Sequence, residues 1–362
     1  MVRSSSSGAQ RYSRGASLKR RASPHRLALV IAASVAASVA FHVLMLYRRG
    51  GSGAGARVEV PPKIVPTVER KTLAREIPRL AIWADAAVHI ERDEPFIFDA
   101  SLCEVEWNIC SEKSTWMSTR WLASEFADRT AVMVSGRRFD QYNADYHEVP
   151  MKEAAKQFFE DEANGTPTYM TWTIDSRRWE ELLRSHIKLP GIFYDRDIVE
   201  KCIGDEFMDE YIDNQFWHQI YAGTSGVGMK MHQDIYRTSL WSVQLEGYKR
   251  WYFCPPKHSE NVYKGKVDAF HPDYEKHPLF RNAESECYDT IVKPGEIVFW
   301  PSVWFHQTSV LPGGSTNLLS VFLNQAVLGK FDPIPSLGKP DLSSGFKDRL
   351  RKCVGEWRNL AK

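Results

Sequence analysis

The sequence has few cysteines, and none of them forms a Cys-x-x-Cys pair. Six cysteines are scattered over 362 residues, which argues against structural zinc sites of the common spacing and against a thioredoxin-like redox motif. No acid pair and no Ser-His-Asp set stands at a recognisable spacing. The sequence therefore shows no sign of the hydrolases that depend on those groups.

Acidic residues are missing from the N-terminal end, where none occurs before Glu59. The whole chain is nevertheless balanced, with 47 Lys and Arg against 45 Asp and Glu and a net charge of +2. Its 43% hydrophobic and 25% charged residues exclude a disordered chain, a collagen-like repeat and a multi-pass membrane protein. Once the basic end is set aside, the charge gives no indication of nucleic-acid binding.

An apolar run follows the basic N-terminal segment 1–26. Residues 27–47 read LALVIAASVAASVAFHVLMLY, and about 20 mostly apolar residues are enough to cross a bilayer as a helix. Basic residues are more numerous before this run than after it, which favours a cytoplasmic N-terminus and a translocated remainder. We therefore predict a transmembrane anchor at 27–47 in a single-pass membrane protein, with its globular domain in the lumen of the endoplasmic reticulum or Golgi. A cleaved signal peptide and an organelle-targeting peptide are the alternatives.

Three further segments follow the predicted anchor. Gly and Ser, and then Pro, dominate residues 48–75, which is typical of a flexible linker. A globular domain is expected at 76–335, and a C-terminal tail at 336–362. Within the tail, residues 346–360 have the apolar spacing of an amphipathic basic helix. This helix either packs on its own domain or forms the contact of a homodimer.

Two features bear on the compartment without deciding it. The even number of cysteines permits disulfides in a lumen but does not require them. Asn164-Gly165-Thr166 is a glycosylation sequon, although about one is expected by chance in a chain of this composition. Neither feature identifies the compartment on its own.

The globular domain is predicted to be mainly β, with helices in its first half. Short strands with turn signals between them indicate a β-sandwich or a small barrel. Glu246-Gly247 is expected to form a tight turn between two strands, and Pro294-Gly295 has the residues of a second turn. Strands are expected at 95–98, 131–134, 168–173, 217–221, 229–234, 240–245, 249–253, 290–292, 297–300, 304–308 and 317–322, and helices from Ser118 and over 152–162.

A candidate metal site begins with His232-Gln233-Asp234. On a strand, side chains two residues apart point to the same face, so His232 and Asp234 can reach one point. His306 lies on a separate predicted strand later in the chain. Two imidazoles and one carboxylate on one face of a metal leave the opposite positions open, as in non-haem Fe(II) oxygenases. Without further support, the short His-x-Asp motif is a weak signal.

Lys249 is a second candidate residue. Strand alternation places it on the same face as Trp251 and Phe253. If these aromatic residues face inward, Lys249 is a charge inside a small β-fold, which is costly unless the charge is paired. The sequence places no carboxylate where it would obviously pair with Lys249, so the carboxylate of a ligand is a natural partner. The alternative is an exposed Lys249 with Arg250 turned inward.

These motifs occur in an order that resembles a known family. The stretch GVGMKMHQDIYRTSLWSVQLEGYKRWYFCPP, followed by KPGEIVFWPSVWFHQTSV, resembles the JmjC (cupin-like) family of Fe(II)- and 2-oxoglutarate-dependent oxygenases, in its protein-hydroxylase branch. The shared elements are His-x-Asp, Gly-Tyr-Lys-Arg-Trp with a Pro-Pro turn, Pro-Gly-Glu and Pro-x-x-Trp-x-His. The resemblance covers residues 76–325. It implies a double-stranded β-helix, a cupin-like jelly roll that is mainly β with flanking helices (α+β).

The resemblance also implies roles for individual residues. His232, Asp234 and His306 correspond to the iron ligands and to the catalytic centre of the family. Lys249 corresponds to the residue that binds the distal carboxylate of 2-oxoglutarate, and Tyr169 to a tyrosine that hydrogen-bonds the same group.

The sequence departs from the family at the cosubstrate pocket. Met229 stands where many relatives have Thr, and Ser242 stands where a relative has Asn. Ser320 is our candidate for the polar residue that faces the cosubstrate from the last core strand. The expected pocket is less polar than is usual in the family, whereas the expected metal site is unaffected.

The activity that the resemblance implies is hydroxylation with Fe(II), 2-oxoglutarate and O2. 2-Oxoglutarate is converted to succinate and CO2 while a hydroxyl group is added to a protein side chain. The same chemistry on methyl-lysine, RNA or a small molecule remains an alternative. A catalytically silent cupin-like protein that binds a ligand or partner is the alternative from another class.

Overall fold

The computed structural model describes residues 69, 72–107, 118–139, 145–185, 187, 191–193, 195–214, 218–332 and 343–360. All of them belong to one compact unit, Lys63–Lys362. The predicted segments 1–26 and 27–47 and most of the linker 48–75 lie outside the described residues. Among the helices that the structure describes, none is both long enough and apolar enough to span a bilayer. The anchor therefore stays a prediction from the sequence.

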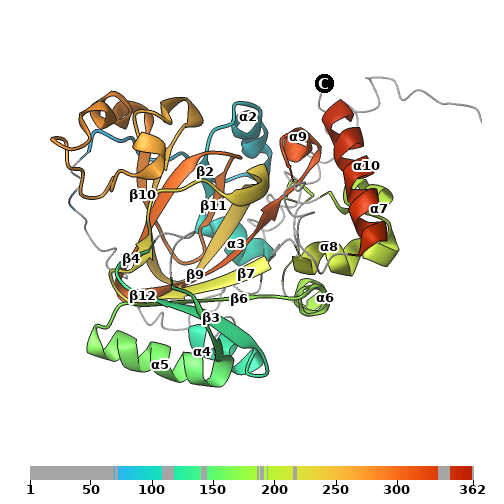
Figure 1. The fold of residues 1–362 in the computed structure, drawn as a ribbon, viewed down its shortest axis with the longest axis horizontal. Coiled ribbons are helices and arrows are strands. Elements are labelled where there is room, and N and C mark those ends of the chain that lie inside the picture. Colours follow the sequence, from blue (N-terminus) through green and yellow to red (C-terminus); the bar gives the residue numbers. More distant parts are fainter. Residues whose placement is uncertain are drawn as a thin grey trace, which may run out of the picture. The chain divides into compact units, whose positions relative to one another are not determined.

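Most of the described strands belong to one ten-stranded sheet (Figure 1). Its order is β1-β2-β11-β9-β12-β7-β6-β3-β5, with β10 paired to β9. The strands of this sheet are Arg79–Leu80 (β1), Phe96–Phe98 (β2), Thr130–Ser135 (β3), His147–Pro150 (β5), Thr168–Thr173 (β6), His218–Gly223 (β7), Ser239–Cys254 (β9), Tyr288–Val292 (β10), Ile297–Trp300 (β11) and Phe305–Phe322 (β12), and a two-stranded sheet holds Arg138–Phe139 (β4) and Gly228–Met229 (β8).

The central strands β9 and β12 are much longer than the sequence predicts. They contain 16 and 18 residues and pair antiparallel along both of their halves. The prediction of a tight turn at Glu246-Gly247 is wrong, because the chain continues through these residues as one strand. Gly247 has a φ of +66° within β9, a conformation that glycine adopts without steric cost. The glycine signal thus marks an irregularity inside a strand.

Neighbouring strands are irregular at the same level of the sheet. In β12 the pairing with β9 is offset between Val310 and Ser315. A Cβ atom at Gly247 would lie 1.9 Å from the carbonyl oxygen of Gly314, so this close approach requires glycine. On the other side, β10 and β11 both pair with β9, and the turn at Pro294-Gly295 lies between them. These offsets allow one long strand to pair with different neighbours along its two halves. The sheet and the helices around it confirm the predicted mainly-β jelly roll with flanking helices.

The helices lie outside the sheet (Figure 1). Ser118 caps α4 as the sequence predicts, because its Oγ accepts a hydrogen bond from the backbone N of Trp121 at 3.1 Å. Helix α5 packs on β3 and β6 and buries Ala154 and Phe158. The helices are Ala86–Glu91 (α2), Ala100–Glu106 (α3), Thr119–Glu125 (α4), Met151–Asn164 (α5), Ser176–Ser185 (α6), Arg196–Ile203 (α7), Met208–Asn214 (α8), Gln325–Leu328 (α9) and Ser344–Leu360 (α10).

The C-terminal helix α10 packs on its own domain. Its residues Phe346, Leu350, Val354 and Trp357 are no more than 1% exposed. A disulfide between Cys202 and Cys353 joins α10 to α7. The apolar face that could have formed a homodimer contact is therefore already covered within the chain, and the first of the two sequence alternatives holds.

Aromatic side chains fill much of the main core. Phe193 stacks on Trp241 of β9 with ring centroids 5.1 Å apart, and Phe96 stacks on Phe299 at 4.7 Å. Such rings bury a large apolar area in fixed relative orientations. The core therefore holds β2, β9 and β11 in fixed positions relative to one another.

Candidate metal centre and adjoining cleft

His232 and His306 are joined through their backbones. The amide N of His232 donates to the carbonyl oxygen of His306 at 2.9 Å, and the amide N of His306 donates in return at 2.8 Å. This isolated β-bridge places the two imidazole centroids 4.2 Å apart. Both side chains are buried. The fold thus brings together the two histidines that the sequence singles out.

Asp234 completes the group, although it does not lie on a strand. The expected strand over 229–234 is wrong, because β8 ends at Met229 and only His232 forms a bridge beyond it. Asp234 still lies close to both rings, with Oδ1 4.0 Å from Nε2 of His232 and Oδ2 3.6 Å from Nε2 of His306. One ligand atom from each of the three residues lies within 4.8 Å of the others, close enough for one ion to contact all three.

Backbone carbonyls orient both imidazoles. Nδ1 of His232 lies 2.7 Å from the carbonyl oxygen of Lys230, and Nδ1 of His306 lies 3.2 Å from that of Trp304. Because a carbonyl can only accept, each Nδ1 carries the proton in these contacts. Nε2 of each ring therefore keeps its lone pair on the side of Asp234, which is the arrangement of histidines that bind a metal.

Burial sets the charge states of the group. It lowers the pKa of His306 to about 4, and the charge of Lys249 acts in the same direction. Burial raises the pKa of Asp234, although His232 and a hydrogen bond from Nε1 of Trp300 at 2.7 Å oppose this shift. Near neutral pH the site therefore has a neutral imidazole in His306, beside a carboxylate whose charge a bound cation would stabilise.

Lys249 lies inside the fold, as the sequence predicts, and is 3% exposed. Its Nζ donates to the hydroxyl of Tyr169 at 3.1 Å and to Oδ1 of Asn317 at 2.9 Å. No carboxylate of the described residues pairs with it, and burial lowers its pKa to about 7. The neighbouring Arg250 is also buried but forms a two-point pair with Asp289 at 2.9 and 2.6 Å. Lys249, unlike Arg250, thus has only neutral partners among the described residues. A ligand carboxylate beside its ammonium group would form an ion pair.

The two predicted serines differ in position. Ser242 accepts a hydrogen bond from Nδ2 of Asn317 at 2.8 Å, so it supports the amide that contacts Lys249 without lining the pocket itself. The structure does not bring Ser320 to the site, because its Oγ lies 2.7 Å from Nδ1 of His218. Ser320 and Asn317 are three residues apart on β12 and face opposite sides of the sheet. The prediction for Ser320 is therefore wrong.

A shift in strand alternation explains which polar residue faces the pocket. His306 and Thr308, both even-numbered, line the pocket around the triad before the irregular part of β12, whereas Asn317 and Leu319, both odd-numbered, line it afterwards. The offsets at 310–315 and 316–317 reverse the inward parity. The Pro312-Gly313-Gly314 sequence marks the place of that irregularity, but it does not show which residues of β12 face the pocket after it.

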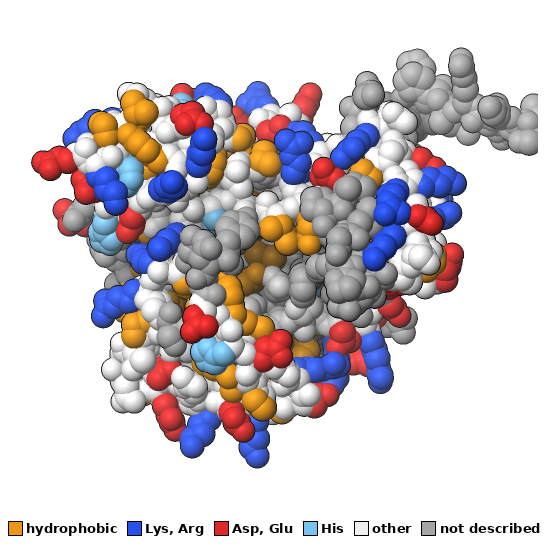
Figure 2. Space-filling view, in the orientation of Figure 1, with side chains coloured by type: hydrophobic (Ala, Val, Ile, Leu, Met, Phe, Trp, Pro, Cys, Tyr) orange, Lys and Arg blue, Asp and Glu red, His pale blue; other side chains and the backbone are white. Residues whose placement is uncertain are grey.

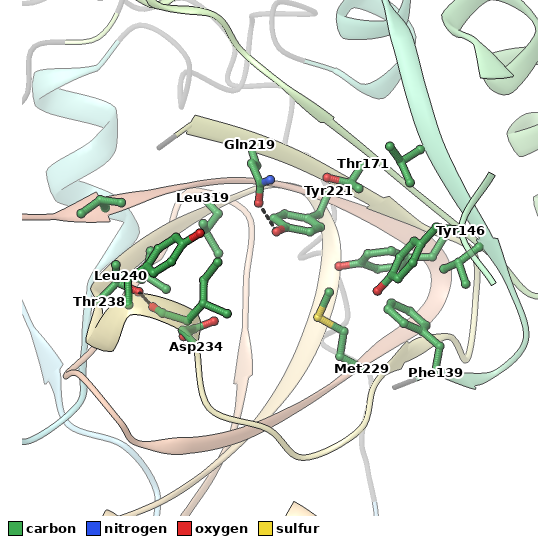
Figure 3. A pocket seen from close by; sticks show the side chains of 16 residues that line it. Phe139, Tyr146, Thr171, Gln219, Tyr221, Met229, Asp234, Thr238, Leu240 and Leu319 are labelled. Atoms are coloured by element: carbon green, nitrogen blue, oxygen red, sulfur yellow. Dashed lines mark hydrogen bonds between the residues drawn. The ribbon is translucent and has the colours of Figure 1, made fainter. Parts of the chain in front are cut away.

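A cleft of about 490 Å³ opens beside Asp234. Figure 2 shows a hydrophobic hollow near the middle of the face that is viewed there. In the close-up of the cleft, Tyr146, Phe139 and Met229 lie together, and Tyr221 donates a hydrogen bond to Gln219 (Figure 3). Among the described lining residues, Asp234 is the only charged side chain. The cleft therefore offers aromatic and neutral hydrogen-bonding groups next to the three candidate ligands.

Comparison with known proteins agrees with this geometry. The profile of the cupin-like domain matches residues 86–325, a range that holds both histidines, Asp234 and Lys249. The chain belongs to the cupin-like family. This match confirms the family that the sequence motifs predict.

Curated relatives carry names that fit the predicted chemistry. A zebrafish (Danio rerio) protein named 2-oxoglutarate and iron-dependent oxygenase JMJD4 is 26% identical over 65% of this chain and 56% of its own length. The arginine-specific demethylase JMJ20 of Arabidopsis thaliana is 32% identical over 28% of this chain and 27% of its own. The tRNA wybutosine-synthesizing protein 5 of Gallus gallus is 28% identical over 42% of this chain and 50% of its own.

The chain thus spans about half or less of the length of these relatives. At the level of the shared domain, the comparisons confirm an oxygenase domain of the type that uses iron, 2-oxoglutarate and O2. The profile of the domain begins at residue 86, so it does not cover residues 1–85.

Proposed function

We propose that the whole protein is a membrane-anchored Fe(II)- and 2-oxoglutarate-dependent oxygenase that hydroxylates a protein side chain. The observation that carries this proposal is the convergence of His232, Asp234 and His306 within 4.8 Å of one another. Lys249 supports it, because a buried ammonium group with only neutral partners suits the far carboxylate of 2-oxoglutarate. These groups also count against a catalytically silent cupin-like protein.

Each residue would have a defined task. Iron with 2-oxoglutarate and O2 supplies the oxidising chemistry when bound. His232 and His306 would present Nε2 to the ion, held in that orientation by their bonds to backbone carbonyls. Lys249 and Tyr169 would fix the distal end of the cosubstrate, and Asn317 would hold the ammonium group in place. The rings around the cleft would exclude water from the reacting carbon.

The lining of the cleft favours a protein substrate over RNA. Among the described lining residues no Lys or Arg faces the cleft, whereas nucleic-acid binding draws its affinity from cations on phosphates. The aromatic rings and the neutral hydrogen-bonding groups that line the cleft suit an amino-acid side chain. The names of the relatives include both an arginine-specific demethylase and a tRNA-modifying protein, so the same chemistry on methylated side chains or on RNA is the alternative.

The proposed compartment is the lumen of the endoplasmic reticulum or Golgi. The apolar run 27–47 with its basic leading flank supports an anchor with a translocated domain. Every cysteine that the structure describes is disulfide-bonded, and disulfides persist in oxidising compartments.

Turnover of 2-oxoglutarate tests the proposed activity. We expect the purified full chain to form succinate when Fe(II), O2 and 2-oxoglutarate are supplied, and the variants His232→Ala and Asp234→Ala to lose at least about 100-fold of this activity because the ion loses a ligand. His271→Ala, which changes an exposed histidine outside the site, is the matched control and should keep full activity. Equal succinate formation in all of these proteins would refute the assigned ligands.

A further inference from the structure

The only Asn-x-Ser/Thr sequence in the chain is Asn164-Gly165-Thr166. Asn164 is the last residue of α5, and Gly165 follows it in the left-handed region with a φ of +70°. All three residues are exposed. The sequon thus lies in a turn on the surface, where an acceptor amide is accessible to an enzyme.

The backbone around the sequon leaves its side chains free for modification. The amide N of Thr166 donates to the carbonyl oxygen of Asp161 at 2.8 Å, and the carbonyl of Thr166 accepts from Thr224 at 2.9 Å. These bonds hold the turn through its main chain. A side chain at Gly165 would meet no atom within 4 Å, so the space around the turn is open.

The sequon lies at the end of the fold away from the three candidate ligands. Glu162, in the last turn of α5, accepts hydrogen bonds from Ser225 in the turn after β7. Glu162 also lies next to Gly314, in the irregular part of β12. His306 belongs to the opposite end of the same half-strand. A large group on Asn164 would therefore lie at the end of this half-strand away from His306.

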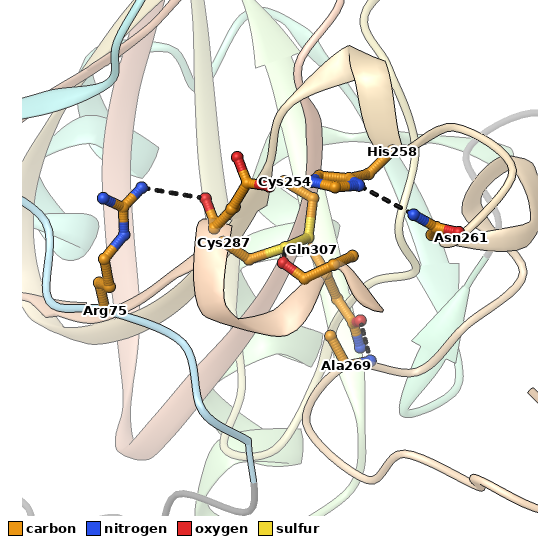
Figure 4. Close-up of a disulfide and its surroundings, with 9 residues drawn as sticks. Arg75, Cys254, His258, Asn261, Ala269, Cys287 and Gln307 are labelled. Atoms are coloured by element: carbon orange, nitrogen blue, oxygen red, sulfur yellow. Dashed lines mark hydrogen bonds and ion pairs between the residues drawn. A yellow bond between two sulfur atoms is a disulfide. The ribbon is translucent and has the colours of Figure 1, made fainter. Parts of the chain in front are cut away.

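The disulfides indicate the compartment in which such a group is added. Cys254 and Cys287 are joined where β9 ends and β10 begins (Figure 4), and Cys202 is joined to Cys353. Disulfide formation and the transfer of oligosaccharides to Asn-x-Ser/Thr both mark secreted and lumenal domains. The disulfides of the structure and the exposed sequon are separate observations that point to the same environment.

We propose that Asn164 is a site of N-linked glycosylation. The donor is an oligosaccharide joined through N-acetylglucosamine to a lipid pyrophosphate. Nδ2 of Asn164 forms a bond to C1 of the sugar, the bond between C1 and the pyrophosphate oxygen breaks, and the lipid pyrophosphate leaves. Nδ2 loses one proton, and nothing is oxidised or reduced.

Translation of the full chain with microsomes from the endoplasmic reticulum tests this site. We expect the wild type to gain one glycan, seen as a lower gel mobility that peptide N-glycosidase reverses. Asn164→Gln and Thr166→Ala should lose the shift, because each removes a required group of the sequon. Thr166→Ser is the matched control, since it keeps the hydroxyl, and it should retain the shift.

A second acceptor asparagine distinguishes two explanations for a missing glycan: an Asn164 that is not an acceptor, and a domain that does not enter the vesicle. Asp128 is exposed and precedes Arg129-Thr130, so Asp128→Asn creates a sequon with one substitution. In the double variant Asp128→Asn/Asn164→Gln we expect one glycan, which shows that the domain is inside the vesicle. A wild type without glycan overturns the proposal. If Asp128→Asn/Asn164→Gln is then modified, Asn164 itself is not an acceptor, and if it is not modified, the lumenal premise has failed.

Discussion

Lys249 has a buried amino group with neutral partners, which makes the stability of the ligand-free protein depend on pH. Burial lowers its pKa from 10.5 to about 7 in the folded chain. Between about pH 7 and pH 10.5, Lys249 holds a proton in the unfolded chain that it lacks in the folded chain. The free energy of unfolding must therefore rise with pH in this range, by up to about 1.4 kcal/mol per pH unit from this group.

We expect Lys249→Met to remove this slope. The measurement is urea unfolding of wild type and variant at several values between about pH 7 and 9, below the range in which tyrosines titrate. The difference in free energy of unfolding between the two proteins should change steadily with pH. When 2-oxoglutarate and a metal ion are added, the free energy of unfolding of the wild type should depend less on pH, because the ligand carboxylate pairs with the ammonium group. A constant difference would mean that Lys249 is not a buried base.

Asn317 presents a neutral amide oxygen to Nζ of Lys249. An aspartate has nearly the same shape as asparagine but would carry a negative charge at this position. In Asn317→Asp, the new carboxylate would pair with Lys249 at the present distance of 2.9 Å and so compete with the cosubstrate. We expect the 2-oxoglutarate concentration for half-maximal succinate formation to rise at least about 10-fold, which corresponds to about 1.4 kcal/mol, with metal affinity unchanged.

The matched control for Asn317→Asp is Ser242→Ala, which removes the hydroxyl that accepts from Nδ2 of Asn317 without adding a charge. Its effect on the cosubstrate requirement should be smaller. An equal effect of the two changes would assign Asn317 a structural role only.

At the scale of elements, the two described disulfides hold different parts of the fold. Cys202–Cys353 joins α7 to α10, which lie outside the sheet (Figure 1). Cys254–Cys287 joins β9 to the segment before β10, and Cys254 pairs with Phe305, next to His306. Loss of either disulfide should lower the stability, but only the second adjoins a candidate metal ligand.

We expect Cys202→Ser/Cys353→Ser and Cys254→Ser/Cys287→Ser each to lower the free energy of unfolding by about 2–4 kcal/mol. Only Cys254→Ser/Cys287→Ser should also weaken binding of a divalent metal, because the register that positions His306 is less constrained. Chemical unfolding and calorimetric titration with Co(II) measure the two effects. Equal metal affinity in both double variants would show that the disulfide does not position the site.

The elements that the sequence predicts well are those with local signals. The strand at 168–173 has the predicted bounds, and α5 extends the predicted helix 152–162 by a few residues. The long strands were predicted as pairs of short ones, because glycine at 247 and the Pro-Gly-Gly at 312–314 look like reversing turns. Whether a glycine reverses a strand or kinks it depends on neighbouring strands, and that information is not local.

The candidate site shows the same limit. His232, Asp234, His306 and Lys249 could be selected from their motifs and from the cost of burying a charge. Asn317 could not, because the parity of β12 changes at an irregularity that tertiary pairing creates. Residues chosen by motif thus lie where expected, whereas the residue chosen by its place on a strand, Ser320, points away.

At the scale of the whole molecule, the remaining prediction concerns the segment that precedes the fold. An uncleaved helix at 27–47 would keep the full chain in the membrane after carbonate extraction, whereas a cleaved signal peptide or a transit peptide would release a shortened chain. We expect the full-length chain in the membrane pellet, detected with tags at both ends.

Two arginines introduced into residues 27–47 test whether this apolar run holds the chain in the membrane. Ala37→Arg/Val39→Arg adds about 2.5–3.5 kcal/mol per residue to insertion near the helix centre, and we expect this variant to move into the carbonate supernatant. Ala37→Leu/Val39→Leu is the matched control and should stay in the pellet, because it keeps the run apolar. If the arginine variant stays in the pellet as fully as the wild type, the chain is held by something other than residues 27–47, and the lumenal position of the oxygenase domain loses its main support.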